Sequence, residues 1–78
     1  MWHEGQIAIP PSNIIYKYQA KVYDIGSEHG INQGRVSKLM IRQNKDNKIV
    51  FNWDRGMDID CETDEVRKVL EVILTKFS

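Results

Sequence analysis

The stretch Tyr16-Lys17-Tyr18-Gln19-Ala20-Lys21-Val22-Tyr23 alternates between residues suited to a protein core and residues suited to water. Tyr16, Tyr18, Ala20 and Val22 would share one face of an extended strand, because successive strand side chains point to opposite sides. This alternation is typical of a strand with one buried face. We therefore expect a sheet that turns one face toward a core and the other toward solvent.

Three further segments are predicted to extend this sheet, at residues 2–9, 36–43 and 48–53. In the last of them, Ile49, Phe51 and Trp53 would share the buried face. Pro10-Pro11-Ser12-Asn13 should separate the first two strands, because proline lacks an amide donor and restricts the residue before it. Asn44-Lys45-Asp46-Asn47 predicts a hairpin turn, since Asn and Asp tolerate left-handed backbone geometry.

A helix is predicted to begin after Thr63, which has a hydroxyl able to cap the first turn. Asp64 and Glu65 follow it, where the helix dipole favours negative charge. The apolar residues then recur at intervals of three and four and form one stripe: Val66, Val69, Leu70, Ile73 and Phe77. The expected fold is an α+β two-layer sandwich, in which an antiparallel sheet of three to four strands has one C-terminal helix packed on one face.

Size and composition limit the function classes. The chain has 78 residues, 11 Lys plus Arg, 11 Asp plus Glu and a net charge of zero, so we expect a single domain over residues 1–78 without the field that drives sequence-independent nucleic-acid binding. The lone Cys61 excludes an internal disulfide, and the two histidines lack metal-ligand spacing. No segment has the length of a membrane span or the pattern of a signal peptide. We expect a cytoplasmic protein without membrane association, cofactor or metal.

The first candidate site is the segment from Asp24 to Arg35, which contains three glycines and no apolar periodicity. Connections of this length are often functional. It does not match a phosphate-binding loop, because Gly34 is followed by an expected strand rather than by Lys, Ser or Thr opening a helix. Two interpretations remain open. It is a recognition loop, or it is a structural loop in which the glycines supply positive φ angles and Ser27 and Asn32 bond the local backbone.

The second candidate site is the segment from Asp54 to Asp60, which is charged and is expected to be irregular. In a structural interpretation Arg55 pairs with Asp54 or Asp58, and Arg35 joins them from the other loop. In a functional interpretation the segment forms a protein-recognition surface, because Trp, Tyr, Met and Arg are enriched at interface centres. The predicted binding residues of the two segments and their neighbours are Tyr23, Glu28, His29, Asn32, Arg35, Trp53, Asp54, Arg55, Met57 and Asp58. The aspartates do not follow the ligand order of a calcium loop.

No catalytic residues are predicted. His29 lies next to Glu28, but adjacent residues on an extended chain point apart and no nucleophile can be named. Cys61 precedes the expected helix without a His partner, so we expect a partly buried thiol. For nucleic acid, Lys17, Lys21, Lys38, Arg42 and Tyr23 would lie on the outward face of the sheet as in a single-strand binder, but any solvated sheet face shows the same pattern. The zero net charge favours a protein partner over nucleic acid.

Three stretches of the chain resemble a family of small uncharacterised proteins, a domain of unknown function from Gram-positive bacteria and their phages and mobile elements. These stretches are Trp2-His3-Glu4-Gly5, residues 18–39 with Gly26-Ser27-Glu28-His29-Gly30-Ile31-Asn32-Gln33-Gly34-Arg35 at their centre, and Asn52-Trp53-Asp54-Arg55-Gly56-Met57-Asp58. The chain departs from the pattern by inserting residues around Pro10–Asn13. The resemblance implies a small phage-associated accessory protein and assigns no catalytic residue, cofactor or partner.

The sequence thus predicts a noncatalytic binding module rather than an enzyme. Its expected partner is a host protein bound through the loops around Glu28–Arg35 and Trp53–Asp58. Two alternatives stay open at this point. One is a structural homodimer formed through an exposed sheet edge or face, and the other is a weak single-stranded nucleic-acid binder.

Overall fold

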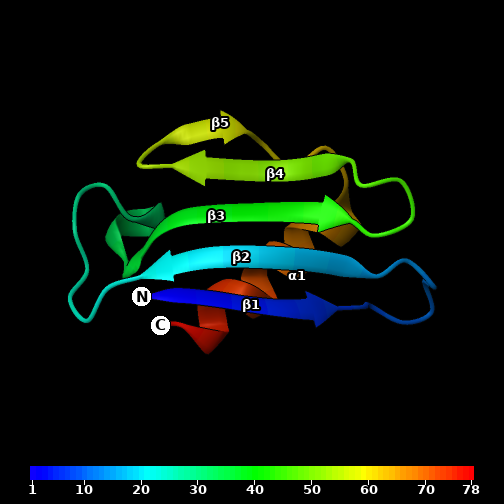
Figure 1. Ribbon diagram of the computed structural model, residues 1–78, viewed down its shortest axis with the longest axis horizontal. Helices are drawn as coiled ribbons and strands as arrows, with labels where there is room; N and C mark the ends of the chain where they lie inside the picture. Colours follow the sequence, from blue (N-terminus) through cyan, green and yellow to red (C-terminus); the bar gives the residue numbers. More distant parts are fainter.

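A computed structural model describes residues 1–78, the whole chain, as one antiparallel sheet and one helix. The strands are β1 (Trp2–Ile7), β2 (Tyr16–Val22), β3 (Val36–Gln43), β4 (Ile49–Asp54) and β5 (Met57–Ile59). They lie side by side in chain order, each antiparallel to the next. The helix α1 (Asp64–Lys76) crosses one face diagonally, from the β4 side to the β1 side (Figure 1). The expected α+β fold with an antiparallel sheet and a C-terminal helix is confirmed.

The core lies between this helix and the sheet. On β2, Tyr16, Tyr18, Ala20 and Val22 are all buried and alternate with more exposed residues, as predicted. The predicted helix stripe meets them, since Val66, Val69, Ile73 and Phe77 are buried and Leu70 packs against the cluster. The Thr63 hydroxyl accepts a hydrogen bond from the Val66 amide at 3.1 Å and caps the helix. The opposite face of the sheet has no covering layer.

The predicted count of three to four strands is wrong, because the sheet has five. The segment from Asp54 to Asp60 was expected to be irregular, but it turns tightly at Arg55 and Gly56 and returns as β5 beside β4. Arg55 has a positive φ of 63°, and the Asp54 amide donates to the Gly56 carbonyl at 3.0 Å. A left-handed arginine is uncommon, and a strand of three residues is too short for alternation to reveal.

Two strand expectations need smaller corrections. β1 ends at Ile7 rather than Ile9, although Ile9 still packs against the core. The register of β3 with β4 shifts between Ile41 and Arg42, as in a β-bulge. Because one extra residue reverses the alternation, Ile49 is exposed instead of sharing the buried face with Phe51.

Candidate functional site

Both candidate segments lie at the same end of the sheet, on the left in Figure 1. The β2–β3 connection and the β4–β5 turn are joined there by a side-chain hydrogen bond, in which Trp53 Nε1 donates to the His29 carbonyl at 3.0 Å. The backbone amide of Arg55 also donates to the Ser37 carbonyl, at 2.9 Å. The two segments, about 25 residues apart in the chain, therefore form one surface.

The β2–β3 connection is compact and contains the 3₁₀ turn η1 (Ile31–Gln33), whose Ile31 side chain is buried. The expectation that its glycines supply positive φ angles is wrong: no glycine has one, whereas Asn32 and Gln33 do. Gly30 is required for a different reason, because a Cβ atom there would lie 1.9 Å from the Gly34 carbonyl oxygen. The expected local bond of Ser27 is present, since its hydroxyl accepts from the His29 amide at 3.3 Å.

A hollow of about 670 Å³ opens where the two segments meet. Three cationic side chains line it, and Asp24 is its one carboxylate. The full lining is Lys21, Tyr23, Asp24, Ile25, Ser27, His29, Ser37, Lys38 and Arg55. We call this set the loop-end surface. Its positive charge favours an anionic group in whatever binds there.

The electrostatics of the loop-end surface act on Tyr23. The Lys21 ammonium lies 5.5 Å from the centroid of the Tyr23 ring, a cation–π distance. Hydrogen bonding to Lys21 lowers the pKa of Tyr23 below its usual value, and Ser37 and the charge of Arg55 act in the same direction. These groups favour the ionised form of the Tyr23 hydroxyl.

The two arginines differ in what they contact. Arg35 Nε donates to the Tyr23 carbonyl at 2.9 Å and its Nη1 to the Ser78 carbonyl at 3.5 Å, so it connects the loop to the C-terminus. Neither arginine pairs with an aspartate, because the two ion pairs of the structure are Lys38 with Asp54 and His29 with Glu28. The Arg55 guanidinium therefore stays available on the surface.

The comparison with protein families covers the entire chain. Residues 1–78 match the model described as Domain of unknown function (DUF7678). The chain belongs to the DUF7678 family. No curated protein and no solved structure matches it.

The remaining predicted residues of this DUF7678 domain lie outside the hollow. Asn32 lines a smaller hollow beside Arg35 and the helix C-terminus, on another side of the loop. Asp58 accepts a hydrogen bond from the Asn52 amide at 2.9 Å, and Met57 is exposed on β5. Trp53 is half-buried and packs on the core, so its role is to hold the loop. Of the ten predicted residues, the hollow brings together Tyr23, His29 and Arg55.

The predicted protein-binding residues did not include six residues that line the hollow: Lys21, Asp24, Ile25, Ser27, Ser37 and Lys38. Lys21 and Lys38 are direct cross-strand partners in the β2–β3 register. Both lysines lie near the ends of two predicted strands that the long loop joins. This position could have indicated that they belong to the site formed by the loop. Ser37 is the one buried polar residue of the core region, and alternation along residues 36–43 places it on the same face as Leu39 and Ile41, but that pattern does not indicate that it also lines the hollow.

The structure gives no geometry for metal chemistry in this DUF7678 domain, since no three His, Cys, Asp or Glu side chains lie close enough to hold an ion. Burial raises the pKa of the Cys61 thiol, and the charge of Asp60 raises it further. That thiol is therefore less ionised than a free cysteine and is a poor nucleophile at neutral pH. No helix is long and apolar enough to cross a membrane.

Proposed function

We propose that this protein is a noncatalytic binding module that engages a protein partner through the loop-end surface. The observation that carries the proposal is that an exposed isoleucine, an exposed tyrosine and an unpaired arginine lie together on the edge of the hollow in the loop-end surface, which we call the rim. Ile25 is 81% exposed and Tyr23 46% exposed, and Arg55 lies in the same lining. Aromatic and arginine side chains are the residues that most often dominate protein interfaces.

The rim is held in place before any partner arrives. The hydrogen bond from Trp53 to His29 joins the two loops, and Arg35 fixes the Tyr23 backbone. Ordering flexible loops costs free energy on binding, so a fixed rim leaves more of the contact energy for affinity. This supports a recognition role for a connection that is long for so small a domain.

The partner segment should carry a carboxylate beside an apolar residue. Arg55 offers a planar fork that binds a carboxylate through two parallel hydrogen bonds. Lys21 and Lys38 add positive charge next to it, while Ile25 offers apolar contact. Consistent with the family resemblance, we further propose that the protein is a phage or mobile-element accessory protein that binds a host protein in the cytoplasm.

The test is capture of the tagged protein's partners from a nuclease-treated lysate of its source cells. Three versions are compared: wild type, Arg55→Ala, and Arg67→Ala, which makes the same change on the exposed side of α1. We expect one stoichiometric partner with wild type and Arg67→Ala and its loss with Arg55→Ala. If all three versions retain the same proteins, the loop-end surface is not the binding site.

A homodimer through the uncovered edge of β1 is the alternative that the same preparation tests. Light scattering at several concentrations should give the mass of one chain, 9.1 kDa. A mass of two chains that persists on dilution and in the absence of any captured protein would replace the partner proposal with the homodimer.

A further inference from the structure

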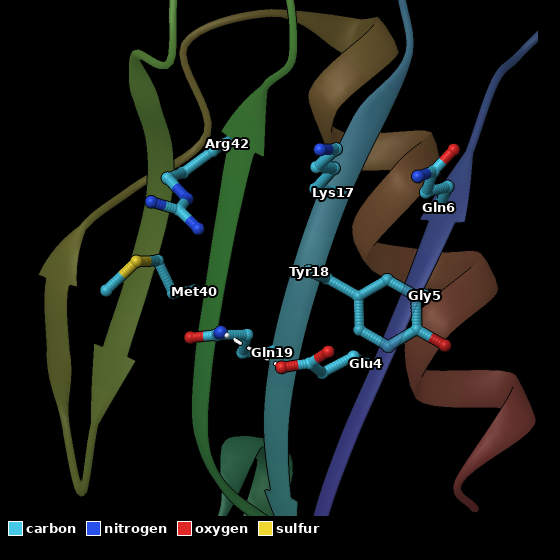
Figure 2. Close-up of a pocket in the computed structure, with 8 residues that line it drawn as sticks. All are labelled: Glu4, Gly5, Gln6, Lys17, Tyr18, Gln19, Met40 and Arg42. Atoms are coloured by element: carbon cyan, nitrogen blue, oxygen red, sulfur yellow. Dashed lines mark hydrogen bonds between the residues drawn. The ribbon is translucent and has the colours of Figure 1, made fainter.

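The open face of the sheet, opposite α1, is a second surface with a different chemistry. Strand register arranges its side chains in three rows across β1 to β4. The rows are Trp2, Lys21, Lys38 and Asp54; then Glu4, Gln19, Met40 and Asn52; then Gln6, Lys17, Arg42 and Ile49. Figure 2 shows the β1 to β3 members of the second and third rows, with Lys17, Gln6 and Arg42 above the pair of Glu4 and Gln19.

The central strands concentrate positive charge on this face. Lys17 lies directly opposite Arg42, and Lys21 lies directly opposite Lys38. Like charges at directly opposed positions destabilise an antiparallel sheet, because their Cβ atoms are only about 5 Å apart. An anionic ligand that lies along the strands and neutralises these charges would explain why two such pairs occur on one face.

The carboxylates of the open face do not cancel these charges fully. Glu4 lies on the edge strand and accepts a hydrogen bond from the Gln19 amide at 3.2 Å. Asp54 lies 3.6 Å from Lys38, and because both side chains are exposed to solvent it offsets that charge only weakly. The negative charges that balance the chain to zero lie mainly outside this face, and five of them fall between residues 58 and 65. Positive and negative charge are therefore segregated on the molecule.

Two adjoining hollows, which we call the trough, lie on the surface between the Lys17–Arg42 pair and Lys38. One hollow of about 360 Å³ includes Lys17, Arg42, Gln19 and Met40. A second, of about 240 Å³, shares Gln19 and Met40 with it and continues to Trp2 and Lys38. Lys38 also lines the loop-end hollow. The cationic pairs stand four strand residues apart, about 13 Å, so an extended chain can follow this trough from one pair to the other.

We propose that the open face binds single-stranded nucleic acid along this trough. The two cationic pairs contact the phosphates. Bases stack on the exposed aromatic rings, Trp2 at 57% exposure and Tyr23 at the end of the trough. Gln6, Gln19 and Asn52 supply amides that can bond base edges. Sheet faces that combine cations with aromatic platforms bind single strands in this way without reading a fixed sequence. The inference does not depend on the protein partner proposed above, although Lys21, Lys38 and Tyr23 belong to both surfaces.

The test measures binding of a fluorescein-labelled 12-nucleotide oligothymidylate by anisotropy between 50 and 200 mM salt. Four phosphate contacts on a single strand predict a slope of log K against log salt of about −2.8, which is roughly a 50-fold loss of affinity over this range. The double variant Lys17→Gln/Arg42→Gln should halve the slope to about −1.4. Lys45→Gln/Lys68→Gln makes the same charge change away from the open face and should leave the slope unchanged.

Two further arms separate the source of the binding energy. Trp2→Ala should weaken binding about fivefold or more if a base stacks on the ring. A 12-base-pair duplex offers the phosphates without free bases and should bind more weakly than the single strand. Absence of binding by the folded protein at 50 mM salt overturns the proposal. So do an unchanged slope in Lys17→Gln/Arg42→Gln, or a polyglutamate peptide that competes as well as the oligonucleotide does, which would assign the face to an acidic peptide.

Discussion

The hydrogen bond from Trp53 Nε1 to the His29 carbonyl should determine how firmly the β2–β3 loop is held. Trp53→Phe keeps an aromatic ring on the core but removes the donor together with the pyrrole part of the indole, a change in ring size that Trp2→Phe also makes. The bond lies at an exposed position, so water can replace it at the carbonyl and the net loss should be about 1 kcal/mol. A change of 1 kcal/mol raises the population of the open loop roughly fivefold.

Amide hydrogen exchange measures this directly. The Gly30, Gln33 and Gly34 amides donate to carbonyls within the loop, so their exchange reports on loop opening. Their protection should fall about fivefold in Trp53→Phe, while the amides of β2 and β3 lose no more than the global change in stability. Trp2→Phe is the matched control, because Trp2 lies on the open face and forms no such bond.

If the loop amides exchange at the wild-type rate in Trp53→Phe, the hydrogen bond from Trp53 to His29 does not hold the loop. The same conclusion would follow if Trp2→Phe had the same effect on them, since the loop would then respond to general destabilisation. If the loop opens but the partner is still captured at the wild-type level, the preformed rim is unnecessary for binding.

Three further comparisons test the rest of the structure. Phe51→Ala, at a fully buried position, should lower the free energy of unfolding by about 3–5 kcal/mol in denaturant titration, whereas Val72→Ala on the exposed side of the helix should change it by less than about 0.5 kcal/mol. Gly30→Ala should distort the loop, which would shift the amide resonances of residues 26–34. Gly56→Ala should shift few resonances, because no atom lies within 4 Å of the added methyl group. Equal shifts in the two variants would contradict the packing argument. Burial and the hydrogen bond to Glu65 raise the pKa of Tyr16 to about 12. The folded state therefore keeps a proton that the unfolded state loses above its pKa of about 10. The free energy of unfolding should fall between pH 10 and 12 more steeply in wild type than in Tyr16→Phe. Parallel curves for the two proteins would show that Tyr16 titrates normally.

Alternation and helical periodicity predicted the elements that bury apolar side chains in a regular pattern. The strand at Tyr16–Val22 and the helix capped by Thr63 follow from these rules, because each places its apolar residues on one face. β5 could not be predicted in this way, since it has three residues and begins after an arginine with positive φ. The outward turn of Ile49 depends on a bulge opposite Arg42, which no local pattern in the sequence encodes.

The candidate site was predicted only in part. Its two segments were identified from composition, but which residues face each other depends on long-range geometry. The sequence gives no reason to distinguish Arg35 from Arg55. In the structure Arg35 donates to backbone carbonyls, whereas the Arg55 guanidinium remains available to a partner. Trp53 was predicted as a contact residue, whereas the structure uses its indole N–H to hold the loop. Lys38 became part of the site because strand register places it opposite Lys21.

Site-specific photocrosslinking tests directly whether a protein partner contacts the loop-end surface. A benzophenone amino acid is placed at Ile25, and in a control protein at Val72 on the exposed side of α1, and each is irradiated in source-cell lysate. The account predicts one discrete crosslinked protein from position 25, absent from position 72 and suppressed by Arg55→Ala. Crosslinks that are the same from both positions, or that form only from position 72, would contradict it.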